Sequence, residues 1–243
     1  MELEARLAFA NQIAKAAGKR TLKYFQTTLF DVQKKEDGSP LTIADQDAER
    51  YLRKMIQESY PSDSIVGEEF ESVEGSSPYR WILDPIDGTT NFLHGIPHFA
   101  ISIALKSKNE LLSGLIFDPI KDEMFFAEKD KGAFLNNQRL RVSKKNSLED
   151  CLFSSNHDGV KLSNLNMRCS GSAALDLAYV ASGRLDGYFQ NKINLWDIAA
   201  GALMVKEAGG IVNDISKFDI NKIDIKASSA TISDKMLENL KNF

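Results

Sequence analysis

Apolar residues recur at intervals of three and four positions along the first part of the chain, the spacing that places side chains on one face of a helix. Over residues 2–26 the recurring positions are Leu3, Leu7, Ala10, Ala14, Ala17, Thr21 and Tyr24. A second helix is predicted to begin at Thr42, because Thr42 and Asp45 have the spacing of a capping box. Its apolar stripe consists of Ala44, Ala48, Leu52 and Met55, and Pro61 follows its end.

From residue 63 to residue 155 the pattern changes to short runs rich in β-branched and aromatic residues. The predicted strands are 64–66, 79–83, 99–105, 111–117, 123–127 and 132–135. Turn signals at Asp118-Pro119 and Asn136-Asn137 favour antiparallel neighbours. The first half is therefore predicted to be two helices packed on an antiparallel sheet.

Strands and helices alternate in the second half. The predicted strands are 152–155, 187–190, 211–213 and 226–228, and the predicted helices are 172–182, 197–208 and 234–240. Such alternation is typical of a layered α/β unit. We place a boundary near residue 145, which divides an N-terminal α+β half (1–145) from a C-terminal α/β half (146–243). No Gly/Ser-rich linker separates the halves, so we expect them to share an interface.

Composition narrows the class of protein. The 243 residues are 43% hydrophobic and 26% charged, which is ordinary for a folded globular chain. With a net charge of -4, the chain as a whole lacks the basic footprint that nucleic acid or an anionic membrane surface requires, so we expect neither as a partner. No run approaches the roughly 20 apolar residues of a membrane span, and no signal-peptide pattern is present, so we expect a cytoplasmic protein. Cys151 and Cys169 are predicted to be buried apolar residues.

Candidate chemistry is concentrated after the strand 79–83. Asp84 and Asp87 follow it at a spacing of three, which lets both carboxylates face one side of a turn. Gly88 allows close approach of the backbone to a ligand, and a helical turn is predicted to begin at Thr89 or Thr90. Free N–H groups at that start would form an anion site beside the carboxylates, whose hard oxygen atoms suit Mg²⁺ better than zinc. Asp-Pro or Asp-Gly alone would indicate only a plain turn.

Two further acidic positions are ambiguous by themselves. Glu68 and Glu69 follow a short apolar run, and an isolated Glu-Glu pair is typical of a solvated turn. Asp197 stands at the head of an apolar helix, where an N-cap is the plainer interpretation.

Three segments together resemble the inositol monophosphatase family. They are Gly67-Glu68-Glu69, the run Asp84-Pro85-Ile86-Asp87-Gly88-Thr89-Thr90-Asn91-Phe92, and Trp196-Asp197-Ile198-Ala199-Ala200-Gly201. Further similar segments at 117–120, 132–136 and 207–210 extend the resemblance over nearly the whole chain. The resemblance implies a layered αβαβα sandwich of the sugar phosphatase type. It also implies Mg²⁺-dependent hydrolysis of a small polyol or sugar phosphate monoester by metal-activated water, with myo-inositol 1-phosphate as the default substrate.

The resemblance also implies roles for individual residues. Glu68, Asp84 and the Ile86 carbonyl would hold one Mg²⁺, and Asp84, Asp87 and Asp197 a second. Formal charge leaves room for a third ion near Glu68 and Glu69. The remaining implied roles are phosphate binding by the backbone of Gly88 and Thr89, catalysis by Glu68, Thr89 and Asp87, and substrate binding by Gly171, Ser172, Ala173, Gln190 and Asp197.

The sequence departs from the family pattern at two places. Gln190 stands where inositol-cleaving members usually carry a glutamate, so it keeps one acceptor oxygen and lacks the charge. The segment 155–168, beside the expected pocket, is shorter than in the family. Lys35 and Asp45 match residues that often line the cleft.

Several alternatives remain open at this point. Related enzymes that share the metal motif act as 3′-nucleotidases on adenosine 3′,5′-bisphosphate or as fructose-1,6-bisphosphatases. A mainly RNA- or protein-binding role belongs to a different class of function. The resemblance further implies a homodimer.

Overall fold

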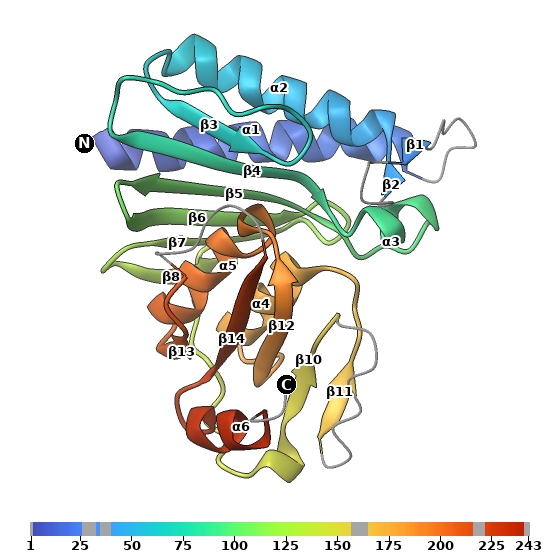
Figure 1. The fold of residues 1–243 in the computed structure, drawn as a ribbon, viewed down its shortest axis with the longest axis vertical. Coiled ribbons are helices and arrows are strands. Elements are labelled where there is room, and N and C mark those ends of the chain that lie inside the picture. Colours follow the sequence, from blue (N-terminus) through green and yellow to red (C-terminus); the bar gives the residue numbers. More distant parts are fainter. Residues whose placement is uncertain (1, 26–32, 35–39, 157–164, 216–221, 241–243) are drawn as a thin grey trace.

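Two long helices form the outermost layer of the protein in the computed structural model (Figure 1). The structure describes residues 2–25, 33–34, 40–156, 165–215 and 222–240. The two helices are α1 (Glu2–Tyr24) and α2 (Ile43–Ser59). The predicted capping box is confirmed, because Thr42 accepts the Asp45 N–H at 3.3 Å and Asp45 accepts the Thr42 N–H at 2.9 Å.

A seven-stranded sheet lies beneath these helices (Figure 1). Its order is β3 (Ser64–Gly67), β4 (Tyr79–Asp87), β5 (Ala100–Ser107), β6 (Glu110–Asp118), β7 (Glu123–Glu128), β8 (Gly132–Leu135) and β9 (Gln138–Arg139). The neighbours from β4 to β9 are antiparallel, as predicted. The prediction is wrong for β3, which runs parallel to β4. The chain after β3 turns back, with Val73 bridging Ile65 in the antiparallel sense, so that β4 starts from the same end as β3.

A second, five-stranded sheet is mixed. Its order is β11 (Asn166–Arg168), β10 (Leu152–Ser154), β12 (Gly187–Ile193), β14 (Ile223–Ser229) and β13 (Gly210–Val212). Strand β10 is parallel to both of its neighbours, whereas β14 is antiparallel to both of its own. Strand β11 is absent from the sequence-based prediction. The small remaining elements are β1 (Gln33–Lys34), β2 (Pro40–Leu41) and a 3₁₀ turn at Leu148–Asp150.

Helices α4 (Ala173–Ala181) and α5 (Leu195–Glu207) lie between the two sheets, and α6 (Ser233–Asn239) packs on the far side of the second sheet (Figure 1). Helix α5 is apolar on nearly all sides because it contacts both sheets. A Cβ at Gly201 would lie 2.4 Å from the Leu177 Cβ, so α4 and α5 approach closely there. This order of layers confirms the predicted αβαβα sandwich.

The hydrophobic core joins the two halves of the chain. One buried cluster contains Ile82 and Ile116 from the first sheet together with Leu177 and Ala200 from the middle helices. The expected shared interface is therefore present, while the boundary near residue 145 stays a prediction. Among the described residues, no helix is both long enough and apolar enough to cross a membrane.

One sequence-based expectation about a single residue is wrong, and one interpretation that was left open is ruled out. Cys169 is exposed, whereas Cys151 is buried as predicted. The N-cap of α5 is Asn194, not Asp197, because the helix begins two residues earlier than its apolar pattern indicates. Asp197 is instead the third helical residue, and its carboxylate accepts the Asn194 N–H at 3.1 Å.

Candidate metal centre

Asp84 and Asp87 project from the last part of β4, where the strand is irregular. Asp84 pairs with Ser102 of β5, but Asp87 pairs with Ala100, so three steps on β4 match two on β5. In a regular strand, residues three apart point to opposite faces, and a bulge changes this relation. The two carboxylates therefore share a side because of a bulged strand, not because of the turn that their spacing predicted.

Asp197 brings a third carboxylate to the same place from the first turn of α5. Asp84, Asp87 and Asp197 each offer an oxygen atom, and these atoms all lie within 4.8 Å of one another. The two strand residues are buried, and Asp197 is half-buried. Three acidic residues from two elements thus converge at the edge of the first sheet.

Glu68 completes the acidic group from the end of β3. Its side chain hydrogen-bonds Asp84, and its charge acts on Asp87 and Asp197 as well. Parallel pairing of β3 with β4 explains the meeting, because Gly67 lies opposite Leu83 and the next residue along each strand is acidic. Glu68 itself is half-exposed.

Burial and mutual repulsion change the acidity of this group. Burial, followed by the charges of Glu68, Asp87 and Asp197, raises the pKa of Asp84 well above its usual value. Burial and the charges of Asp87 and Glu68 likewise raise the pKa of Asp197. Burial raises the pKa of Asp87 to about 7, although hydrogen bonds from Ser172 and Ala174 act in the opposite direction. A bound cation would favour the ionised form of these carboxylates, because it compensates the burial and mutual repulsion that raise their pKa values.

This donor set fits Mg²⁺. Carboxylate oxygen atoms are the ligands that hard divalent cations prefer, and the site offers them from several side chains at once. Ile86, between the two aspartates of β4, donates its N–H to Asp84 Oδ1 at 3.0 Å, and its carbonyl oxygen accepts the Thr89 hydroxyl at 3.1 Å. Of the residues predicted to hold metal, Asp84, Asp87 and Asp197 therefore lie together, and Glu68 hydrogen-bonds Asp84. That they bind Mg²⁺ stays a prediction.

Thr89 and Gly88 form the adjoining start of α3 (Thr89–Leu93). Gly88 has φ 97°, and a Cβ there would lie 3.1 Å from the His98 carbonyl oxygen, so the position favours glycine. The Thr89 hydroxyl lies 3.1 Å from the Ile86 carbonyl oxygen and 3.4 Å from Asp45 Oδ1. Both are acceptors, so the hydroxyl proton points toward them and the lone pairs are left for another partner.

Asp87 is held by the start of α4. The Ser172 hydroxyl donates to Asp87 Oδ2, and the Ala174 N–H donates to the same oxygen at 2.9 Å. Ser172 is buried, so its side chain serves to hold Asp87, and Ala173 is buried beside it. Gly171, in contrast, is exposed. Contact of Gly171, Ser172 and Ala173 with substrate stays a prediction.

Glu49 and Arg53 of α2 are structural supports of the site that the sequence analysis missed. Glu49 Oε2 accepts the Glu69 N–H at 2.8 Å, and Arg53 donates to Glu49 Oε1 at 2.7 Å. A Cβ at Gly67 would lie 2.2 Å from Glu49 Oε1, so α2 lies directly against the turn that carries Glu68. The i,i+4 Glu-Arg pair was a possible signal, but such pairs are common on solvated helices.

Gln190 lies on β12, and its Oε1 accepts a hydrogen bond from the Tyr188 hydroxyl at 2.5 Å. Asp45, which the family resemblance also places at the cleft, is buried beside Thr89. Lys35 and residues 157–164 of the shortened segment lie outside the described residues.

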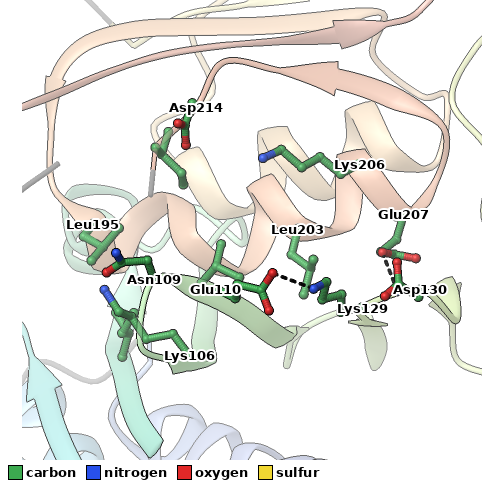
Figure 2. A pocket seen from close by; sticks show the side chains of 13 residues that line it. Lys106, Asn109, Glu110, Lys129, Asp130, Leu195, Leu203, Lys206, Glu207 and Asp214 are labelled. Atoms are coloured by element: carbon green, nitrogen blue, oxygen red, sulfur yellow. Dashed lines mark hydrogen bonds and ion pairs between the residues drawn. The ribbon is translucent and has the colours of Figure 1, made fainter. Parts of the chain in front are cut away.

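A separate cavity of about 320 Å³ lies on another part of the molecule, along α5 and the β5–β6 turn. Figure 2 shows Lys106, Lys129 and Lys206 around it, with the ion pair between Lys129 and Glu110. The predicted site residues do not line it. The candidate metal centre is therefore defined by converging side chains and not by this cavity.

The layers and the acidic centre place this protein in the class of α+β sandwiches of the sugar phosphatase type. The chain belongs to the inositol monophosphatase family, whose model matches residues 2–242. It is 41% identical over 230 residues to an inositol-1-monophosphatase of Rhizobium meliloti (strain 1021), and the match covers 86% of each chain. It is 39% identical over 235 residues to a Nus factor SuhB of Pseudomonas aeruginosa, covering 88% of this chain and 87% of that one.

A solved structure shows the same fold. The crystal structure of the extragenic suppressor protein suhB from Bartonella henselae superposes with a TM-score of 0.91 at 38% identity, and 98% of each chain is covered. These similarities confirm the predicted family and fold. They also confirm the predicted enzyme class, an inositol-1-monophosphatase-like phosphoric monoester hydrolase.

Proposed function

We propose that this protein hydrolyses a small polyol or sugar phosphate monoester in the presence of Mg²⁺, with myo-inositol 1-phosphate as the first substrate to test. The observation that carries this proposal is the convergence of Asp84, Asp87 and Asp197, with Glu68 bonded to Asp84. A buried acidic group of this kind needs a cation, and a cation beside a helix start can bind phosphate.

The residues present suggest how the ions would be held. Glu68, Asp84 and the Ile86 carbonyl would hold one Mg²⁺, Asp84, Asp87 and Asp197 a second, and Glu68 with Glu69 a third. When bound, Mg²⁺ stabilises negative charge on a phosphoryl group and lowers the pKa of water.

The protein supplies orientation and a proton acceptor. The backbone N–H groups of Gly88 and Thr89 would bind phosphate oxygen atoms at the start of α3. Because the Thr89 hydroxyl proton is directed to Ile86 and Asp45, its lone pairs can hold the attacking water. Glu68 would accept the proton, and its partial exposure lets it return that proton to solvent.

A phosphate-release screen with Mg²⁺ across polyol, sugar and nucleotide monoesters tests the proposal. We expect turnover of polyol or sugar monoesters that disappears when EDTA removes the metal. Turnover of adenosine 3′,5′-bisphosphate alone would indicate a 3′-nucleotidase instead. Turnover of fructose 1,6-bisphosphate alone would indicate a fructose-1,6-bisphosphatase instead.

A second candidate function is binding of RNA or a protein complex, which the relative named Nus factor SuhB favours. The net charge of -4 supports a protein partner rather than nucleic acid. Loss of hydrolysis in an Asp87→Asn variant that keeps its biological function would favour this candidate. A homodimer and a cytoplasmic location complete the proposal, on the strength of the family resemblance.

A further inference from the structure

The cavity along α5 has an apolar wall of a size that suits a small organic molecule (Figure 2). The wall consists of Ile82 and Leu111 from the first sheet, Leu195 and Leu203 from α5, and Ile215. The volume of about 320 Å³ lies at the lower end of the range of about 300–1,000 Å³ that is typical of ligand sites. The cavity can therefore hold a small apolar body.

The charged residues around this cavity differ in whether the protein itself provides them with a partner. Lys129 pairs with Glu110 at 2.7 Å. Glu207 accepts a backbone N–H on each of its carboxylate oxygen atoms, both at 2.8 Å. Lys106, in contrast, has no hydrogen bond or ion pair from its side chain within the described part of the chain. The remaining charged lining residues are exposed, and they are Asp130, Lys206 and Asp214.

The side chain of Lys106 faces the space between the first sheet and α5. Lys106 lies directly opposite Arg80 in the antiparallel pair of β5 and β4, so the two side chains share a face of the sheet. Ile82, two residues after Arg80, is on the same face and packs in the core cluster that contains α5. In Figure 2, Lys106 lies toward the Leu195 end of the cavity and Glu207 toward the opposite end. The ammonium group is therefore at the less acidic end.

The position of Lys106 is electrostatically unfavourable without a further partner. Like charges directly opposite each other on neighbouring strands destabilise a sheet. Arg80 is compensated by Glu74 at 2.6 Å, whereas Lys106 has no such carboxylate. Lys106 is also half-buried, and burial followed by the charge of Arg80 lowers the pKa of its ammonium group. Local rules of stability are typically broken at functional positions, and an anion in the cavity would supply the missing partner.

We propose that this cavity binds a small organic anion, whose charged group pairs with Lys106 and whose apolar body packs against Leu195 and Leu203. The inference is independent of the proposed hydrolysis, because none of the predicted site residues lines the cavity. A hydrogen bond between two charged groups is roughly twice as strong as a neutral one, and burial of the apolar body adds to the affinity in proportion to its area. A carboxylate is the class to test, since a phosphate would also be attracted to the proposed metal centre.

A series of head groups on one apolar body tests the class of ligand. 4-Phenylbutyrate, 4-phenylbutan-1-ol and 4-phenylbutylamine carry a negative, a neutral and a positive group on the same skeleton. Binding to the full chain is measured by calorimetry in EDTA, so that no metal ion can hold the carboxylate. We expect a Kd of about 1 mM or tighter for 4-phenylbutyrate, and a Kd at least about tenfold weaker for the alcohol and the amine. Acetate, which lacks the apolar body, should also bind at least about tenfold more weakly.

Two lysine variants locate the site. Lys106→Gln should weaken 4-phenylbutyrate binding about tenfold and remove the preference for the carboxylate over the alcohol. Its melting temperature should not fall, because the variant loses an uncompensated charge opposite Arg80, and this readout separates lost binding from lost fold. Lys226→Gln is the matched control, since Lys226 is a half-buried lysine of β14 that does not line the cavity. It should keep the wild-type Kd.

Four outcomes would overturn the inference. They are a carboxylate that binds no more tightly than the alcohol, an amine that binds more tightly than the carboxylate, a wild-type Kd in Lys106→Gln, and equal losses of binding in the two lysine variants. Binding of 4-phenylbutyrate that requires Mg²⁺, or that inorganic phosphate with Mg²⁺ displaces, would place the probe at the acidic centre and overturn the inference as well.

Failure of the proposed function would look different. Absence of Mg²⁺-dependent phosphate release from every ester in the screen would contradict the phosphatase proposal. The binding of 4-phenylbutyrate is measured without metal and without turnover, so that result would leave the outcome for the cavity unchanged.

Discussion

At the scale of single residues, the candidate metal centre contains buried carboxylates that repel each other, and the proposed cation would relieve this repulsion. Asp87 shows both sides of this balance. Its pKa is raised to about 7 by burial, yet Ser172 and Ala174 hold its carboxylate in place. A group arranged in this way contributes to ligand binding at the expense of the stability of the free protein.

The Asp87→Asn variant should lose most of its activity. We expect kcat/KM to fall by about a hundredfold to a thousandfold, the usual effect of removing one electrostatic contact to a developing charge. Phosphate release with Mg²⁺ measures this effect. Asp47→Asn, at a partly exposed ion pair with Arg20, is the matched control and should keep wild-type activity. Equal activity of Asp87→Asn and the wild type would contradict the role of Asp87.

The metal-free protein should lose stability as the pH rises. The folded-state pKa of Asp87 is about 7, above its usual value of 3.8, so the contribution of this group to stability is fully present below pH 3.8 and is lost as the pH rises through 7. Urea unfolding with EDTA at about pH 5 and about pH 8 measures the change. Mg²⁺ should raise the free energy of unfolding more at the higher pH. A metal-free protein that is more stable at the higher pH would contradict this account.

At the scale of elements, helix α2 supports the turn that carries Glu68. Glu49 accepts the Glu69 N–H, while Arg53 donates to Glu49 and, at 2.8 Å, to the Phe70 carbonyl oxygen. Burial raises the pKa of Glu49 despite these hydrogen bonds, so the carboxylate depends on its partners. Helix α2 thereby positions Glu68, which the sequence motif identifies but does not place in space.

Replacing Glu49 should weaken both the fold and metal binding. Glu49→Gln leaves Arg53 without its buried partner, and we expect the free energy of unfolding to fall by about 3 kcal/mol. Mg²⁺ affinity, measured by calorimetry, should fall as well because the Glu68 turn loosens. Glu58→Gln, which breaks an exposed pair with Lys54 on the same helix, should change stability by less than about 0.5 kcal/mol. Equal effects of the two variants would contradict the role of Glu49.

At the scale of the whole molecule, the centre depends on the distance between the first sheet and α5. Asp84 and Asp87 belong to the sheet, whereas Asp197 belongs to the helix. Close packing sets that distance, because a Cβ at Gly114 of β6 would lie 2.6 Å from the Ala200 carbonyl oxygen. The absence of a side chain at Gly114 therefore sets the distance between Asp197 and the two aspartates of the sheet, on which the proposed metal binding depends.

Gly114→Ala should separate the two layers. Overpacking of this kind lowers the free energy of unfolding by about 1–3 kcal/mol. Because Asp197 moves with α5, we also expect Mg²⁺ to raise the melting temperature less than in the wild type. Gly209→Ala is a comparison variant, since a Cβ at Gly209 meets no atom within 4 Å. It is strained only by its φ of 90° and should keep the wild-type response to Mg²⁺. A full Mg²⁺ response in Gly114→Ala would contradict the packing argument.

The elements themselves could largely be predicted from the sequence. Helical spacing and the Thr42–Asp45 capping box located α2 correctly, since these signals depend on neighbours within one turn. The acidic residues of the site could be named from their motifs, and they do lie together. The parallel pairing of β3, the bulge between Asp84 and Asp87, and the start of α5 at Leu195 could not be predicted, because they depend on partner strands and layers.

The sequence by itself thus determined the family, the acidic residues and most helix and strand positions. Local periodicity and short motifs are properties of the chain before it folds. Only the tertiary structure decided that Glu49 supports the turn of Glu68, that Ser172 holds Asp87, and that Tyr188 hydrogen-bonds Gln190. Contacts between layers have no local signature, since they depend on how sheets and helices pack and on which buried polar group finds a partner.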